Sequence, residues 1–401
     1  MITTKNLIFI SLSILGSFSL GYFGLPKLYS VKYLTQSAQV LNTDQQSLIE
    51  APIVDIVQKN IEVGPFDRTS VTHTQTPEPL KAIYMSSWVA STTDFRNKLI
   101  KIIDETEINT VVIDIKDYTG KIAFEVSDPY LQKIGSSEKR ISDIIGLISL
   151  LHSKGIYVIG RVAVFQDPYL IKSRPDLAVK QFTDKSIIWT DHKGIGWLDA
   201  GSQDVWDYII AISNEAYADG FDEINYDYIR FPSDGNMKNI YFPISEGKSK
   251  PEVVKGFFMY LHDHLKNTGI KTSADVFGMV ATNTDDLNIG QVLENTLPYF
   301  DYVAPMVYPS HFPPTWNGYK NPAAMPYETI QYSMNKAVER AKAIGENPLK
   351  LRPWLQDFSL GATYTSDMVR AQIKATYDVG LTSWMLWDPA NTYTVGALEK
   401  N

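Results

Sequence analysis

The 401-residue chain has no cysteine and only six histidines. Without cysteine, the chain cannot form a disulfide, a thiolate nucleophile, or a cysteine-bound zinc or iron–sulfur site. The histidines offer little to a metal, because His262 and His264 are two residues apart on an expected helix and face different ways, while the others are scattered. We therefore expect no metal and no cofactor, and a metal-dependent deacetylase or similar hydrolase is disfavoured.

Three further patterns are missing, and each absence argues against a class of protein. Lysine and arginine do not cluster, and the net charge of −8 with a pI near 5.4 argues against nucleic acid as a partner. No Gly-x-Ser-x-Gly elbow occurs, so serine hydrolase chemistry is not indicated. A glycine-rich phosphate turn is also lacking, because the segment 194–199 has no third glycine. A doubly wound open sheet is therefore only the second choice of architecture.

One long uncharged run lies at the amino terminus. Residues 6–25 carry no charge and are long enough to cross the hydrocarbon core of a bilayer as a helix. We expect residues 1–26 to be a membrane anchor or a secretory signal peptide, and we favour the anchor because no clear Ala-x-Ala cleavage site follows. Residues 27–80 are expected to be a linker. These features predict an extracytoplasmic protein, membrane-anchored or secreted.

From residue 81 onward, short apolar runs alternate with amphipathic helical patterns. This alternation is typical of parallel strands joined by crossover helices. It predicts a (β/α)8 TIM barrel with enlarged loops over residues 81–398. The eight apolar runs cover residues 82–85, 110–116, 157–165, 223–229, 271–277, 302–308, 349–355 and 382–387. The helices expected between them cover residues 94–107, 141–154, 203–218, 252–266, 288–297, 329–344 and 366–377.

The fourth run has one polar and one apolar face. Side chains alternate along a strand, so Glu223, Asn225 and Asp227 share one face and apolar residues fill the other. An unpaired buried polar atom costs roughly 1–3 kcal/mol, so a polar face inside a sheet needs partners. A filled barrel with a catalytic mouth supplies them. An edge strand with its polar face in water is the simpler interpretation, but the repeated strand pattern argues against it.

Acidic and aromatic residues recur where the expected strands end, which is where the chemistry of such barrels is located. For a single carboxylate, a helix cap or a loop salt bridge is an equally good explanation, so the recurrence carries the argument. Together with the basic and amide residues beside them, the candidate site residues are Asp114, Lys116, Asp117, Arg161, Asn225, Asp227, Arg230, Asp275, Tyr308, His311, Trp354, Gln356, Asp357, Trp387 and Asp388.

Two carboxyl groups facing across a cleft suit the cleavage of a glycosidic bond. One carboxylic acid protonates the leaving oxygen, and the other, as a carboxylate, attacks the sugar or activates water. Aromatic rings at the mouth offer flat apolar surfaces to the faces of pyranose rings, and polar groups bind their hydroxyls. The sequence therefore favours a carbohydrate as the substrate.

The motifs at these positions resemble those of a bacterial glycoside hydrolase family with a TIM-barrel fold, catalogued as a domain of unknown function. The resemblance runs from about Ala82 to Tyr393, and residues 112–117, 161–168, 225–232, 273–278, 306–311 and 352–356 carry it. The chain is also distantly similar to alpha-amylase and alpha-galactosidase barrels, whose nucleophile is an aspartate at the end of the fourth strand. The resemblance implies Asp227 as the nucleophile and Asp275 as the acid.

The other candidate residues are expected to bind or orient the sugar. Arg161 and Arg230 would keep Asp227 ionised, because a nearby cation lowers the pKa of a carboxyl group. The apolar neighbours of Asp275 would raise its pKa, as a general acid requires. The expected function is hydrolysis of an extracellular or cell-envelope polysaccharide. The alternative is a non-catalytic carbohydrate-binding or cell-wall scaffold protein on a barrel fold.

Overall fold

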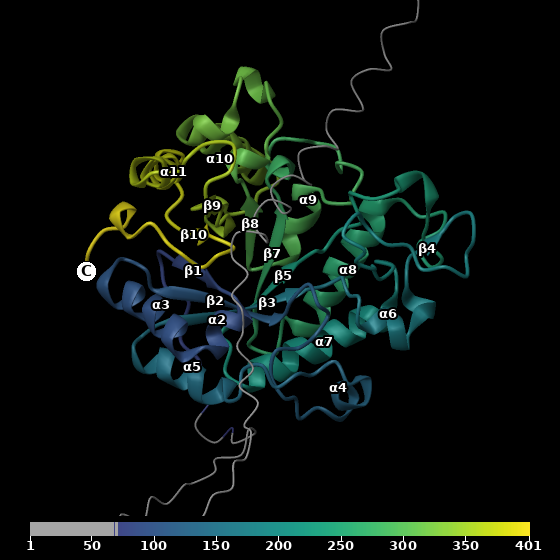
Figure 1. Cartoon of the computed structure of the whole chain (residues 1–401). Coiled ribbons are helices and arrows are strands. Elements are labelled where there is room, and N and C mark those ends of the chain that lie inside the picture. The colour runs from purple at the N-terminus through teal and green to yellow at the C-terminus, as the bar shows by residue number, and fades with distance from the viewer. Residues whose placement is uncertain (1–67, 69–70) are drawn as a thin grey trace, which may run out of the picture.

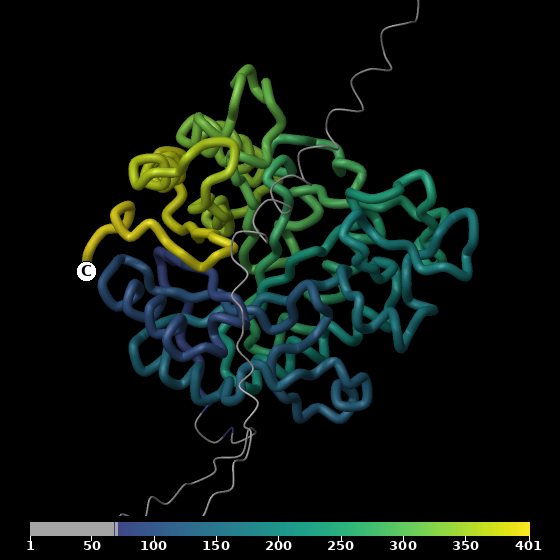
Figure 2. Tube along the Cα trace, in the orientation of Figure 1, coloured from purple at the N-terminus to yellow at the C-terminus, as the bar shows by residue number. Residues whose placement is uncertain are grey.

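The computed structural model describes residue 68 and residues 71–401. Eight parallel strands close into a barrel in the order β1-β10-β9-β8-β7-β5-β3-β2, and helices surround them (Figure 1). The last strand, β10, pairs with β1, so the yellow C-terminal part of the chain lies beside the blue start of the barrel (Figure 2). The expected (β/α)8 TIM barrel is confirmed.

The barrel strands lie close to the expected runs, although several are shorter. Their bounds are β1 Lys81–Met85, β2 Thr110–Lys116, β3 Tyr157–Ala163, β5 Glu223–Asp227, β7 Lys271–Phe277, β8 Tyr302–Met306, β9 Trp354–Gln356 and β10 Trp384–Trp387. The strand expected at residues 349–355 is wrong in its first half, where Pro348–Lys350 forms a 3-10 turn. Pro353 has no N–H to give to a ladder, so β9 begins only after it.

The helices cover the outside of the barrel. Their bounds are α2 Ser87–Ser91, α3 Thr93–Glu105, α4 Pro129–Ile134, α5 Ile144–Ser153, α6 Leu170–Ser173, α7 Gln203–Ala218, α8 Lys250–Leu265, α9 Leu293–Thr296, α10 Pro326–Ala343 and α11 Ser366–Asp378. The helix expected at residues 288–297 is wrong apart from the single turn of α9. Leu287, Asn288 and Gly290 all have positive φ, which a right-handed helix does not allow.

The buried apolar residues form two separate clusters. The larger lies between the outer faces of the strands and the helices, and it includes Ile113, Ile224 and Phe257. The smaller fills the inside of the barrel with residues such as Tyr84 and Trp354. The strands therefore bury both faces, and polar side chains on their inner faces have to find partners within the barrel.

The loops after β3 and β5 are long and meet at one side of the barrel. Each contributes a two-residue strand, β4 Lys180–Gln181 and β6 Ile240–Tyr241, and the two pair antiparallel. This part is drawn in teal at the right of Figure 1. It extends the carboxyl side of the barrel beyond β3 and β5.

Part of the expected linker belongs to the folded barrel. The N–H of Thr74 donates to Asp222 Oδ1 at 2.7 Å, and Thr76 Oγ1 lies 3.0 Å from the hydroxyl of Tyr157. Leu80 is fully buried, and its N–H donates to Ser383 Oγ at 2.9 Å. The predicted boundary at residue 81 is therefore corrected: residues 71–80 pack across the amino ends of the strands.

None of the helices among the described residues is long and apolar enough to span a membrane. The anchor or signal peptide expected at residues 1–26, and the linker as far as residue 67, lie outside the described residues.

Candidate active site

The inner face of β5 places three polar residues one above another inside the barrel. Glu223 lies at the amino end, Asn225 in the middle and Asp227 at the carboxyl end, and all three are buried. This is the polar face expected from the alternation along the strand, and it points into the barrel. The partners of each residue therefore define three layers, of which the uppermost is the mouth.

At the mouth, Asp227 is held from two sides. Its Oδ2 accepts hydrogen bonds from Arg161 Nη2 at 2.5 Å and Nε at 3.2 Å. Its Oδ1 accepts the N–H of Tyr228 at 2.6 Å. Donors of this kind stabilise the ionised form, so the position suits a carboxylate that acts as a nucleophile or base.

Arg161 also holds a second carboxylate. Its Nη1 donates to Asp114 Oδ1 at 2.7 Å, and the hydroxyl of Tyr84 donates to Asp114 Oδ2 at 2.6 Å. Burial raises the pKa of Asp114, and the charge of Arg161 opposes that shift without cancelling it. One guanidinium therefore serves two buried carboxyl groups, and the cluster has more acids than bases.

Asp275, on β7, lies below the mouth in a nearly closed environment. Its Oδ1 accepts the indole N–H of Trp354 at 2.8 Å and Asn225 Nδ2 at 2.9 Å. Burial, together with the negative charge of Asp227, raises the pKa of Asp275 to about 8. Asp275 therefore favours its protonated form at neutral pH, whereas Asp227 accepts hydrogen bonds from a guanidinium and a backbone N–H. Two carboxyl groups in such different surroundings can serve as the proton donor and the carboxylate of one reaction.

Aromatic side chains form one wall of this site. Trp387 stacks on Tyr84 with ring centroids 4.0 Å apart and meets Trp354 edge-on at 5.5 Å. The guanidinium of Arg161 lies 5.2 Å from the Trp387 ring. Trp387 is partly exposed at the carboxyl end of β10. Tyr308 is buried beside the two aspartates, whose charges raise its pKa together with burial.

The backbone immediately after Asp227 is strained. Tyr228 has φ of 55°, a left-handed conformation that aromatic residues rarely adopt. Such conformations cost about 1–3 kcal/mol and are found mainly at functional sites. Here the strain turns the N–H of Tyr228 back towards Asp227 Oδ1. The turn thus orients the carboxylate at the end of β5.

Three candidate residues cannot touch a substrate directly, because their side chains are completely buried. Lys116 pairs with Asp167 at 2.9 Å and also donates to the carbonyl of Ala163. Trp354 donates to Asp275, and Gln356 Oε1 accepts the N–H of Ser310 at 3.0 Å. The expectation that these three bind sugar is corrected: Trp354 orients Asp275, and the other two hold loops.

Three acidic candidates have structural partners in the loops. Asp117 pairs with Arg140 at 2.6 Å. Asp357 accepts the N–H and hydroxyl of Thr394, and burial raises its pKa to about 6. Asp388 accepts the N–H of Ala390, and burial raises its pKa to about 7. Each of these contacts ties a carboxylate to another part of the rim of the barrel.

Two further candidates, His311 and Arg230, are also basic side chains. Burial lowers the pKa of His311 to about 4, so this ring is neutral at the mouth. Among the residues that the structure describes, no carboxylate lies within ion-pair distance of Arg230. Its guanidinium donates to the carbonyl of Phe231 and to Ser233 Oγ, and it lies 4.5 Å from the Phe277 ring. Arg161 pairs directly with Asp227, whereas Arg230 interacts with Asp227 through its charge over a longer distance.

The sequence reasoning missed Tyr84, which bonds Asp114 and stacks on Trp387. A signal for it exists, since Ala82 and Tyr84 alternate with Ile83 and Met85 along β1 and so share the inner face. No cluster of three or more metal-ligating side chains occurs in the described part of the chain.

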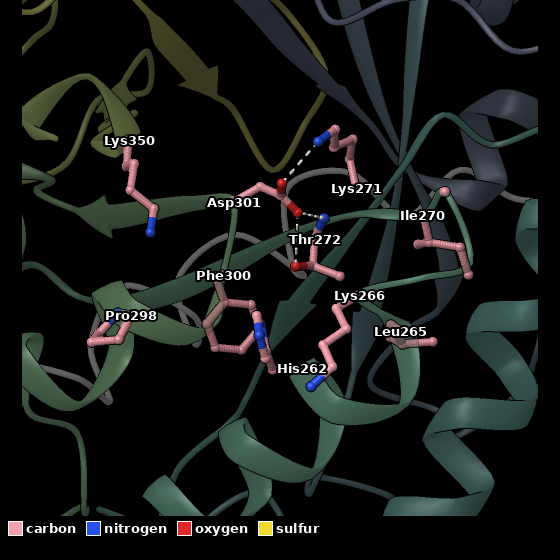
Figure 3. Close-up of a pocket in the computed structure, with 11 residues that line it drawn as sticks. His262, Leu265, Lys266, Ile270, Lys271, Thr272, Pro298, Phe300, Asp301 and Lys350 are labelled. Atoms are coloured by element: carbon pink, nitrogen blue, oxygen red, sulfur yellow. Dashed lines mark hydrogen bonds and ion pairs between the residues drawn. The ribbon is translucent and has the colours of Figure 1, made fainter. Parts of the chain in front are cut away.

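A surface hollow of about 380 Å³ lies at the other end of the barrel (Figure 3). It is lined by residues such as Lys271, which begins β7, and Asp301, which precedes β8, and an ion pair of 3.0 Å joins these two. The amino ends of the strands face away from the mouth, so this hollow is separate from the aspartate pair.

Comparison with known proteins agrees with this fold. The glycoside hydrolase domain of PgaB (BpsB) from Bordetella bronchiseptica is 12% identical, with a TM-score of 0.57, and the match covers 80% of this chain and 99% of that one. A hypothetical protein from Ruminiclostridium thermocellum is 34% identical, with a TM-score of 0.44, over 48% of this chain and 97% of its own. Comparison with curated proteins gives no significant match. A family model described as "Putative glycosyl hydrolase domain" matches residues 82–393, and the chain therefore belongs to this glycosyl hydrolase family.

Proposed function

We propose that this protein hydrolyses a glycosidic bond in an extracellular or cell-envelope polysaccharide, with Asp227 and Asp275 as the catalytic pair. The observation that carries the proposal is the contrast between the two carboxyl groups. Asp227 receives three charge-stabilising hydrogen bonds, whereas burial keeps a proton on Asp275 up to a pH of about 8. Glycoside hydrolysis requires one group of each kind.

In the proposed reaction, Asp275 gives its proton to the leaving glycosidic oxygen as the bond from the anomeric carbon to that oxygen breaks. Asp227 attacks the anomeric carbon or stabilises its positive charge. The resulting Asp275 carboxylate is stabilised by the N–H groups of Trp354 and Asn225. It then takes a proton from the water that completes hydrolysis. Arg161 holds Asp227 in place throughout, and Trp387 packs against the sugar face.

The proposed location rests on the amino-terminal sequence. The uncharged run at residues 6–25 would place the barrel outside the cytoplasm, where the polysaccharides of the cell envelope are found. The net charge of −8 is compatible with a carbohydrate partner and unfavourable for an anionic one such as nucleic acid.

The test is a set of carboxylate-to-amide substitutions assayed on bacterial wall and exopolysaccharide fractions. Asp227→Asn removes the ionised carboxylate, and we expect hydrolysis to fall roughly 10⁴-fold or more. The matched control is Asp263→Asn, the same change on the outside of α8, where the carboxylate pairs only with Lys266. The readout is release of reducing ends, with circular dichroism to verify folding.

Full activity in Asp227→Asn would refute the assignment of the nucleophile. A wild-type protein that binds one of these fractions but never releases reducing ends would instead favour the non-catalytic carbohydrate-binding alternative.

A further inference from the structure

Outside the aspartate pair, the rim of the barrel carries a half-exposed tryptophan on a rigid support. Trp88 follows β1 in α2, and half of its surface (51%) is exposed. Its ring lies 4.0 Å from the guanidinium carbon of Arg140. An exposed indole ring offers a flat apolar face that a ligand can cover.

The guanidinium under this ring is itself fixed. The Arg140 side chain is only 3% exposed, and its Nη1 donates to Asp117 Oδ2 and to Ser87 Oγ, both at 2.6 Å. Arg140 Nε also reaches Glu138 at 3.4 Å. Two short hydrogen bonds hold the Arg140 guanidinium in place. One face of the Trp88 ring therefore packs on a fixed cation.

The backbone of Trp88 is held as well. Its carbonyl accepts the hydroxyls of Ser91 at 2.8 Å and Thr92 at 2.9 Å. Ser86 is the N-cap of α2, and its hydroxyl accepts the N–H of Val89. The N–H of Ser86 donates to Asn391 Oδ1 in the loop after β10. The ring therefore needs little ordering on binding, which lowers the entropic cost of contact with a ligand.

The position of Trp88 connects it with the active site. Strand β1 lies between β10 and β2 in the barrel, and all three strands end at the mouth. Trp387 ends β10 and stacks on Tyr84 of β1, which bonds Asp114 of β2. Trp88 follows the same β1 strand after Tyr84, and the half-exposed Tyr118 follows β2. Trp88 and Tyr118 therefore lie at the same end of the barrel as the aspartate pair.

We propose that Trp88 is a distal sugar-binding platform, on which a pyranose ring of the polysaccharide stacks while another unit of the same chain occupies the aspartate pair. This inference rests on the proposed carbohydrate substrate. It adds that the enzyme engages several sugar units at once, across the ends of β10, β1 and β2. The free face of the indole supplies the flat apolar surface that a sugar ring requires.

The experiment measures binding separately from hydrolysis. The full chain is run in native gels containing xylan, galactomannan, hydroxyethyl cellulose, pullulan or glycol chitosan. We expect at least one polysaccharide to retard the wild type and the Asp227→Asn variant equally. Trp88→Ala should weaken this retardation about three- to tenfold, the value of one aromatic stacking contact. Trp88→Tyr, which keeps a flat ring, should restore most of it.

The matched control is Phe95→Ala on α3. Phe95 is 55% exposed and also lies near a cation, Lys98, at 5.1 Å, but α3 covers the outside of the barrel. If Trp88 serves only to cover the Asp117–Arg140 pair, Trp88→Ala lowers the melting temperature and leaves retardation unchanged. That result overturns the proposal, as does a wild type that none of the gels retards. Loss of hydrolysis in Asp227→Asn with retardation intact separates this inference from the catalytic one.

Discussion

The barrel contains two buried polar layers, one at the amino ends of the strands and one at the mouth, and they are built differently. In the lower layer, Glu223 accepts from Arg352 Nη1 at 3.0 Å and from the hydroxyl of Tyr157 at 3.2 Å. Thr76, from the segment that packs across this end, completes the layer through Tyr157. In the buried part of this layer one acid faces one base, both 1% exposed, and the exposed Glu78 lies 3.9 Å from the same arginine.

In the mouth layer, one guanidinium faces several acids. Arg161 pairs with Asp114 and Asp227, and Asp275 lies close enough for the charge of Asp227 to raise its pKa. An excess of acids can be buried only if one of them keeps its proton. The comparison teaches that the imbalance, more than the number of polar groups, distinguishes a reactive layer from a structural one.

The largest expected effect comes from the same substitution made in each layer. Arg161→Gln and Arg352→Gln each leave a buried carboxylate without its cation, and we expect each to lower the free energy of unfolding by about 3–5 kcal/mol. Only Arg161→Gln should also lower the kcat of the folded enzyme, roughly 100-fold or more, because Asp227 loses its orientation. Urea denaturation measures the first quantity, and an assay per folded molecule measures the second.

If Arg352→Gln lowered kcat per folded molecule as strongly as Arg161→Gln, the two layers would not differ in function. The double variant Glu223→Leu with Arg352→Met tests the structural assignment, since removal of both charges should cost much less than removal of one.

A second prediction concerns pH. The pKa of Asp275 is about 8 in the folded protein and about 3.9 in an unfolded chain. The folded state therefore holds a proton that the unfolded state releases, so stability from this group is complete below pH ~4 and is lost as the pH rises to ~8. Activity should fall above pH ~8 as the general acid loses its proton.

Asp275→Asn keeps the neutral form at every pH, so its melting temperature should overtake that of the wild type on the alkaline side. The two melting curves are compared from pH 5 to 9. Parallel curves across that range would show that Asp275 does not hold a proton in the folded state.

The smallest expected effect comes from the hydrogen bond that tunes Asp275. Trp354→Phe removes the indole N–H that stabilises the carboxylate, so the pKa should rise further and the alkaline limb of kcat/KM should move up by roughly 0.4–1 pH unit. The matched control is Trp384→Phe, an equally buried tryptophan on β10 whose indole donates to Tyr377. An equal shift in both variants would mean that the change is general and does not act through Asp275.

The sequence was a good guide to the strands and a poor one to the contacts of individual side chains. The alternation of Glu223, Asn225 and Asp227 predicted an inner polar face, because side-chain direction on a strand has a fixed period of two. Lys116 shows the limit of this rule. The register of β2 against β3 shifts between Asp114 and Lys116. The Lys116 side chain is fully buried and forms an ion pair with Asp167. A bulge of this kind depends on the neighbouring strand.

By itself, the sequence determined the eight-strand barrel and the acids of the mouth, because period, strand count and the position of a residue along a strand are local properties. Only the tertiary structure decided which acid favours its protonated form, since the pKa of Asp275 on β7 depends on burial, on Trp354 of β9, and on Asn225 and the charge of Asp227 from β5. It also decided that Arg161, and not Arg230, pairs with Asp227. Both outcomes follow from distances between distant segments, and those distances exist only once the barrel has closed.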